Sequence, residues 1–265
     1  SHSGDDAAAA LSVATGPSSS ADIDIDGDEG SLLQLTSNAD LNLFGLVTLT
    51  GNFAFKKATG DFTVADGSTS TQLTSVEYLA VGGNISTASV GIAGVGFTLN
   101  DIALAMVMVS DEANSVEYTT VKASVGSASL TGIPGLTVSV NSLSLEVNQT
   151  DDDANPNKVL DFADTTSHSN DDGASALSVA TGPSSSADID LDGDEGSLLQ
   201  LAGNVDVDLL GFITLSGDFA FKQAVTNLTL DDGSDVTADM LAIGATNVTA
   251  FAGVSLGVTN RLGLE

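Results

Sequence analysis

The sequence predicts an all-β protein of elongated repeat architecture, and three observations lead to that prediction. A long stretch of its 265 residues occurs twice. Within each copy, apolar and polar residues alternate with the period of two that side chains follow along a strand. No segment shows the apolar spacing of an amphipathic helix. A β-solenoid is our first interpretation, and a long antiparallel β-sheet or a β-sandwich is the alternative.

The repeat sets the expected domain organisation. Leu11–Ala58 returns as Leu177–Ala224, with about 36 of 48 aligned residues identical, which indicates a long-period tandem repeat. The opening SHSGDD returns as SHSNDD at Ser167, and this marks the boundary between units. We therefore predict one complete β-rich unit over residues 1–166 and a second, incomplete unit over residues 167–265.

The alternation is clearest from Leu33 to Phe55, where odd positions are mostly apolar and even positions mostly polar. The second copy keeps this phase. A two-residue hairpin loop pairs residue n with n+3 and would reverse the phase. The unbroken phase therefore favours one very long strand, or bends that keep inside and outside unchanged, as in a solenoid. Long antiparallel strands with glycine kinks would give the same pattern, and in each case the odd face is expected to point inward.

Beyond this stretch the apolar residues move to even positions, at Phe62 and Val64, and we interpret Lys56–Gly60 as the turn responsible. Ile102–Val109 is apolar at every position, which is typical of a strand covered on both faces. A helix of that length is the alternative, and the β-like flanks favour the strand. Aromatic residues make up only 5% of the chain and Trp is absent, so the core must be aliphatic and thin. Such a core suits solenoids and long two-layer sheets better than a single globule. Further strands are expected at Val76–Val81, Val95–Leu99, Val116–Leu130 and Leu136–Val147.

The charge balance limits the partners. The chain carries 36 acidic and 6 basic residues, a formal net charge of −30. Binding to nucleic acid or to anionic membrane surfaces requires clustered Lys and Arg, so neither is an expected partner. The longest apolar run is far shorter than the roughly 18 residues of a membrane span, so we expect no membrane insertion. The absence of Cys excludes disulfides and thiolate metal sites.

The sequence DIDIDGDEG, residues 22–30, is the best candidate for a binding site. It matches the opening D-x-D-x-D-G of a calcium-binding loop, in which alternate carboxylates converge and Gly permits a sharp turn. An EF-hand would place Glu where Leu33 stands, so the motif is not an EF-hand. The alternative is a solvated acidic strand face that keeps the protein soluble. The predicted calcium ligands are Asp22, Asp24, Asp26 and Asp28, with Asp188, Asp190, Asp192 and Asp194 in the second copy.

No group of residues in the sequence predicts catalysis. The chain has no G-x-S-x-G nucleophile motif and no Gly-rich phosphate loop between a strand and a helix. Its two histidines, His2 and His168, occupy equivalent acidic loops with no second His or Cys beside them. We therefore predict that the protein is not an enzyme.

Three sequence signatures carry a family resemblance: ADIDIDGDEGSLLQL, GFITLSGDFAFK and LAIGATNVTAFAGV. They resemble repeat units found in tandem in very large, acidic, secreted, adhesin-like surface proteins of marine and other environmental bacteria. The resemblance implies a non-enzymatic, extracellular structural or adhesive module at the bacterial cell surface. Its units would associate with neighbouring units or with themselves to build a rod or filament, with calcium as a stabiliser. The alternative function is a module that binds a glycan or another surface ligand.

Overall fold

The described part of the chain is built almost entirely of β-strands, as the alternation predicts. The computed structural model describes residues 10–23, 25, 30–44, 46–92, 94–163, 174–255 and 261–264. Within this part, no helix has the length and apolar character needed to cross a bilayer. The elements are β1 (Leu11–Gly16), β2 (Ser19–Ile23), β3 (Leu33–Leu43), β4 (Val47–Ala65), β5 (Ser70–Ile92), β6 (Val95–Asp111), β7 (Val116–Thr131), β8 (Leu136–Thr150), β9 (Val159–Asp161), β10 (Leu177–Gly182), β11 (Ser185–Ile189), the 3₁₀ turn η2 (Gly193–Glu195), β12 (Leu198–Leu209), β13 (Ile213–Thr229), β14 (Asp235–Ser255) and β15 (Arg261–Leu264).

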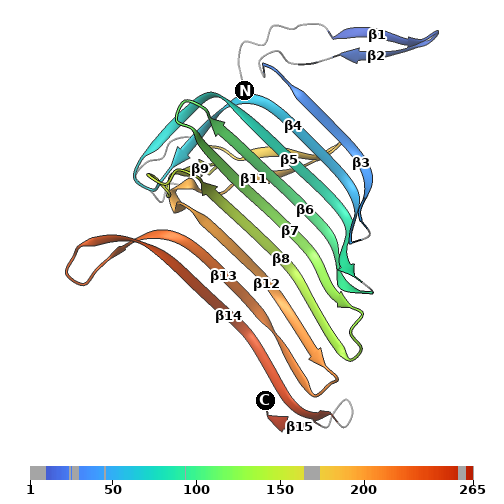
Figure 1. Ribbon diagram of the computed structural model, residues 1–265, viewed down its shortest axis with the longest axis vertical. Coiled ribbons are helices and arrows are strands. Elements are labelled where there is room, and N and C mark those ends of the chain that lie inside the picture. The colour runs from blue at the N-terminus through green and yellow to red at the C-terminus, as the bar shows by residue number, and fades with distance from the viewer. Residues whose placement is uncertain are drawn as a thin grey trace.

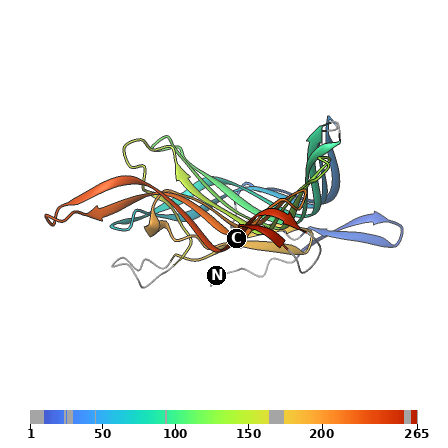
Figure 2. The ribbon, with the colours of Figure 1, turned by 90° about the horizontal axis from the view of Figure 1, so that it is seen from below.

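Eleven strands form one antiparallel sheet in the order β15-β14-β13-β12-β8-β7-β6-β5-β4-β3, with β9 paired to β4. Figure 1 shows the long strands side by side, with β3 and β15 at opposite ends of the sheet. Seen from below in Figure 2, the sheet is a curved layer. The all-β prediction is confirmed, and its alternative, a long antiparallel sheet, describes this arrangement. No solenoid coil occurs among the described residues, so the solenoid is not confirmed.

The sheet continues without interruption from one repeat unit into the next. Strand β8 of the first unit pairs with β12 of the second, for example Val147 with Leu199 and Leu145 with Leu201. Strands β12, β13 and β14 repeat β3, β4 and β5. The two repeats therefore contribute to one sheet rather than to separate cores.

A three-residue loop explains why the phase survives a chain reversal. Leu43 pairs with Val47 across the loop between β3 and β4, so residue n pairs with residue n+4. Odd-numbered residues of both strands therefore lie on the same face of the sheet. The loop begins at Phe44 with a φ of 55°, and its counterpart Leu210 has the same value. A left-handed conformation is uncommon for a bulky residue, and it recurs at the same place in both copies. A two-residue loop would reverse the phase and a three-residue loop keeps it, so the alternation alone does not reveal this hairpin.

The predicted turn at Lys56–Gly60 is wrong, because these residues lie within β4. The pairing of β4 with β5 contains a β-bulge here, because Gly60 pairs with Val76 and Phe62 pairs with Leu73. The extra residue of the bulge lies in β5, so the alternation of side chains along β4 does not change. Even residues of β4 lie on one face throughout. The shift of apolar residues to even positions therefore marks a change in which face is apolar, not a reversal of the chain.

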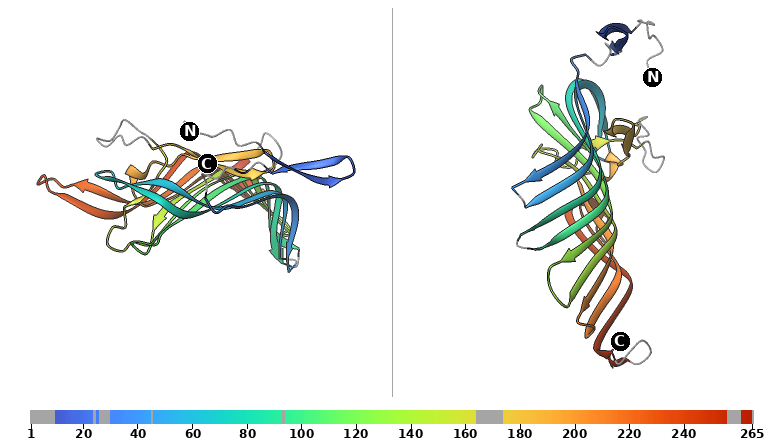
Figure 3. Two further views of the ribbon diagram at one scale, coloured as in Figure 1. Left: turned by 90° about the horizontal axis from the view of Figure 1, so that it is seen from above. Right: turned by 90° about the vertical axis from the view of Figure 1, so that its right-hand side faces the viewer.

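One face of the sheet, called here the covered face, lies beneath β9, the β10–β11 hairpin and η2 (Figure 3, left). The core forms there, around the fully buried Val107, Val109, Leu160 and Ile189. The opposite face, called the open face, carries the odd apolar residues of β3, of which Leu35 is exposed. The expectation that the odd face points inward is therefore wrong for β3. Alternation separates two faces of a strand, but it does not say which face a later segment will cover.

Ile102–Val109 forms part of β6, so the strand prediction is confirmed. Its odd members Ala105, Val107 and Val109 are buried on the covered face. Its even members are half-buried on the open face. The uniform apolar run therefore reflects one packed face and one partly shielded face, rather than a strand covered on both sides.

Candidate functional site at the junction of the repeat units

The acidic motif of the second copy lies where β11 leaves the covered face. Asp188 and Asp190 are exposed, whereas Ile189 and Leu191 between and after them are buried. The predicted alternation of carboxylates with apolar residues is therefore present. In the first copy, Asp22 lies exposed on β2. The other three predicted ligands of that copy, Asp24, Asp26 and Asp28, lie outside the described residues.

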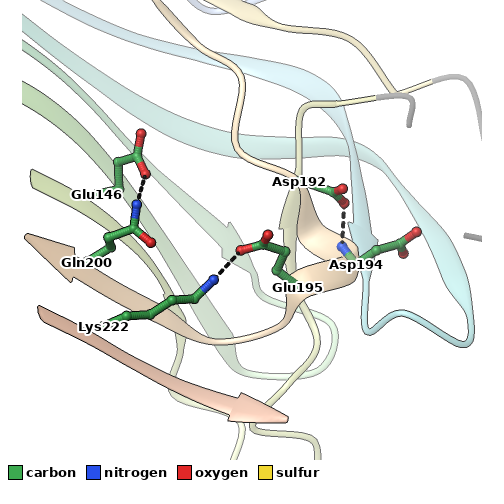
Figure 4. Close-up of polar contacts among 6 residues, drawn as sticks. All are labelled: Glu146, Asp192, Asp194, Glu195, Gln200 and Lys222. Atoms are coloured by element: carbon green, nitrogen blue, oxygen red, sulfur yellow. Dashed lines mark hydrogen bonds and ion pairs between the residues drawn. The ribbon is translucent and has the colours of Figure 1, made fainter. Parts of the chain in front are cut away.

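Two of the predicted ligands of the second copy, Asp190 and Asp192, bind different partners. Asp190 forms an ion pair with Lys122 on β7. The carboxylate of Asp192 caps η2 by accepting a hydrogen bond from the backbone N–H of Asp194 at 2.9 Å (Figure 4). Among the residues that the structure describes, no group of three or more His, Cys, Asp or Glu side chains is placed to hold a metal ion. Calcium binding at this motif stays a prediction.

Backbone hydrogen bonds join the acidic motif of the second unit to β9 and the residue after it, at the end of the first unit. The backbone N–H of Gly193 donates to the carboxylate of the buried Asp161 at 2.9 Å, and the Phe162 N–H donates to the Leu191 carbonyl at 2.9 Å. A Cβ added at Gly193 would lie 2.6 Å from the Asp161 Cβ, closer than carbon atoms can approach. The absence of a side chain at Gly193 therefore permits its backbone to lie in close contact with β9.

The β10–β11 hairpin lies on the covered face of the first unit with its backbone close to the sheet. A Cβ added at Gly82 of β5 would lie only 1.9 Å from the carbonyl oxygen of Ala180. A Cβ added at Gly182 would lie 2.6 Å from the Asn52 Cβ on β4. Val179 and Thr181 of the same hairpin are buried. The contact thus depends on small residues in both the sheet and the hairpin.

Polar contacts also cross the junction. Gln200 on β12 donates to Glu146 on β8 at 3.3 Å (Figure 4). Both side chains share the covered face with Lys122, which pairs with Glu146 in the sheet. Beside them, Lys222 forms an ion pair with Glu195 of η2 at 2.9 Å. Surface ion pairs of this kind are worth at most about 1 kcal/mol each. Of these two contacts, Gln200–Glu146 joins the two units, whereas Lys222–Glu195 lies within the second unit.

A buried hydrogen-bond network was missed by the sequence analysis. The Thr120 hydroxyl donates to the Asn148 side-chain oxygen at 2.7 Å, and the Asn148 amide donates to the Leu160 carbonyl at 2.7 Å. Both side chains are fully buried. They fasten β9, the last strand of the first unit, to β7 and β8. An amide in a Ser- and Thr-rich strand gives no signal of this role, because its partners are distant in the sequence.

A polar hollow of about 390 Å³ lies at the same junction and is lined by both units. The first unit contributes Asp66 and Asn157, and the second contributes Glu195, Lys222 and Met240. Burial acts to raise the pKa of Asp66, but hydrogen bonds from the backbone N–H groups of the β4–β5 turn outweigh it and hold the pKa below 3.8. Its carboxylate is therefore charged at neutral pH and fixes the turn that forms one wall of the hollow.

Comparison with known proteins identifies no relative. No protein-family model matches the chain, and neither a curated protein nor a solved structure matches it. Function must therefore be inferred from the internal repeat and from the junction that the two units form.

Proposed function

We propose that the chain is a non-enzymatic structural or adhesive module that builds an extended rod or filament from tandem repeat units. The observation that carries the proposal is the pairing of β8 with β12, which extends one sheet across the unit boundary. The first unit supplies six neighbouring strands, β3 to β8. Because neighbouring strands lie about 4.8 Å apart, each further unit would lengthen the sheet by roughly 29 Å.

The contacts at the boundary support a module that resists separation from its neighbour. Backbone hydrogen bonds between β8 and β12 join the two units into one sheet, and the β10–β11 hairpin covers the preceding unit. The Lys122–Asp190 ion pair and the hydrogen bond from Gly193 to Asp161 also cross the boundary. In repeat proteins, stability is a sum of unit and interface contributions. An array of such units would gain one full interface with each unit added.

The proposed location is the outside of a bacterial cell, at its surface, where the resembling adhesin-like arrays occur. The net charge of −30 suits a large dispersed protein in salt water. Calcium would reduce the repulsion between the neighbouring carboxylates of the acidic motif, and extracellular calcium sites commonly have dissociation constants of about 10⁻⁴–10⁻³ M.

Binding of a glycan or another surface ligand is the alternative function. Such sites commonly use exposed aromatic side chains, and the chain has two tyrosines. Tyr118 is buried, and the Tyr78 ring packs edge-on against Phe62 with centroids 5.2 Å apart. Neither tyrosine supplies an exposed aromatic platform. The most exposed phenylalanines, Phe44 and Phe212, lie in separate loops, between β3 and β4 and between β12 and β13. The structural role is therefore the better supported of the two.

Small-angle scattering of two proteins tests the proposal: this chain, and a longer chain in which residues 1–166 are duplicated in tandem. We expect the longest dimension to grow by about 30 Å, six strand spacings, while the cross-section stays constant. If the longer protein is instead more compact in all dimensions, with separate or collapsed units, the continuous-sheet rod is refuted.

A further inference from the structure

Two hairpins of identical sequence occupy different environments. Residues Leu11–Ile23 and Leu177–Ile189 are the same residue for residue. Their strand registers are also the same, including the irregularity before the turn. Yet Val179 is 2% exposed whereas its counterpart Val13 is 41% exposed, and Ile189 is 0% exposed whereas Ile23 is 48% exposed. Only the second hairpin has a sheet to pack against; β1–β2 projects away from the sheet (Figure 3, left).

The surface that receives the hairpin is also repeated, and its second copy is bare. In the first unit Ala54 pairs with Gly82; in the second, Ala220 pairs with Gly244 at the equivalent place. Gly82 is covered by the Ala180 carbonyl, whereas a Cβ added at Gly244 would meet nothing within 4 Å. The alanine beside each glycine follows the same rule, because Ala54 is buried and Ala220 is exposed. Ala220 and Gly244 would therefore leave room for the backbone of a hairpin on this surface, but no hairpin lies there.

From these pairs we infer that hairpin β1–β2 of one chain docks on the covered face of β12–β14 in a second copy of the chain. The docking would repeat the contact that β10–β11 makes with β3–β5 inside one chain. It deepens the proposed function, on which it rests, by naming the surfaces through which units associate head to tail. A chain cannot satisfy itself in this way, because β1–β2 precedes β3 at one end of the sheet and β14 lies near the other (Figure 1).

The contact between chains would be smaller than the one within the chain. Within the chain, β10 lies on β3, β4 and β5 and also contacts β6, while β11 lies on β5, β6 and β7. In the second unit, β12–β14 provide the surface for β1, while the only described counterpart of β6 is the short β15. The association is therefore carried by β1 and its side chains Leu11 and Val13. It will be weak and reversible, and it will be opposed by the repulsion between two chains of the same high negative charge.

Two substitutions separate the two halves of the contact. Val13→Asp places a charge on the exposed apolar side of β1, and Gly244→Val fills the bare position on β14 with a side chain suited to a strand. The matched control is Ala245→Val, the next residue along, which lies on the open face and pairs with Phe219. None of the three positions is buried, so we expect each variant to keep the β-sheet circular dichroism and melting temperature of the parent.

Sedimentation velocity of the full chain in about 1 M NaCl, where the Debye length falls to about 3 Å, measures the association. We expect dimers and longer oligomers that grow with concentration up to roughly 1 mM, the weak end of specific binding. Val13→Asp and Gly244→Val should each raise the dissociation constant at least tenfold, while Ala245→Val leaves it unchanged. A mixture of the first two variants should form dimers and nothing longer, since one keeps its receiving surface and the other keeps its hairpin.

Three outcomes would overturn the inference. The chain could stay monomeric throughout, the two variants could associate as the parent does, or the mixture could fail to dimerise although both variants are folded. None of these outcomes contradicts the proposed rod, in which units are joined along one chain and which the scattering experiment tests separately. Association that ignores both substitutions would instead indicate pairing through the exposed strand edges.

Discussion

Adding one methyl group at Gly82 should weaken the junction, and the same change at Gly244 should not. The two glycines occupy equivalent places in β5 and β14, and neither has a positive φ. An alanine Cβ at Gly82 would lie 1.9 Å from the Ala180 carbonyl oxygen, at least 1 Å inside the closest ordinary approach. The obstacle is backbone, so the hairpin must move as a whole.

The size of the effect can be bracketed. If the hairpin shifts slightly, the cost is that of an overpacked core, about 1–3 kcal/mol. If it detaches, Val179, Ile189 and Leu191 lose their burial at about 1.5–3 kcal/mol each, an upper limit of about 5–9 kcal/mol. Gly244→Ala should be neutral or stabilise by up to about 1 kcal/mol, because alanine loses less backbone entropy than glycine on folding.

Calorimetry and hydrogen exchange measure the two variants. With an unfolding entropy of about 2.1 cal/mol/K per residue, a loss of 2 kcal/mol lowers the Tm of a 265-residue chain by about 4 °C. Hydrogen exchange should also speed up over β10 and β11 in Gly82→Ala and remain unchanged there in Gly244→Ala. Equal effects of the two substitutions, or no change in hairpin protection, would refute the close backbone contact.

Three further outcomes are expected. Asn148→Ala should lower the free energy of unfolding by about 2–5 kcal/mol in urea titrations, since it leaves a buried hydroxyl and a buried carbonyl unsatisfied at about 1–3 kcal/mol each, whereas the exposed Asn141→Ala on the same strand should change it by less than about 0.5 kcal/mol. Because the folded pKa of Asp66 lies below its ordinary 3.8, its charge stabilises the fold at neutral pH and loses that effect as pH falls through the folded pKa; the stability gap between the parent and Asp66→Asn should therefore close at low pH, and a gap independent of pH would contradict this. If the acidic motifs bind calcium, the parent should melt higher in about 1 mM calcium than in chelator, and Asp24→Ala with Asp190→Ala should remove much of the difference; identical melting in both conditions would leave solubility as the role of the acid.

The fold class and the two-faced strands could be predicted because both depend on local alternation. The period of two around Leu35 and in the Asp188–Leu191 segment survives in the structure as opposite faces of strands. The chain reversal at Phe44 could not be predicted, because a three-residue loop leaves the phase intact. The turn placed at Lys56–Gly60 was wrong because a change of the apolar face was mistaken for a change of direction.

The candidate site was less predictable because it depends on contacts between distant segments. The sequence indicates that Asp190 alternates with apolar residues, but not that Lys122, in the other unit, lies opposite it. The Thr120–Asn148 pair is hidden for the same reason. The hairpins show the limit most directly, since one sequence gives one local register twice but is buried only where a preceding unit supplies a surface.

The same dependence on a preceding unit would favour the long arrays proposed above. In the proposed array each junction would bury one hairpin against the preceding unit, as β10–β11 is buried here, and the hairpin of the first unit would stay exposed. An array therefore has one uncovered hairpin and one bare receiving surface whatever its length. The free-energy cost of one exposed hairpin would stay constant, while the number of stabilising interfaces between units would grow with each unit added. The free energy of unfolding per unit would therefore rise with the number of units. The same two surfaces would join separate chains end to end.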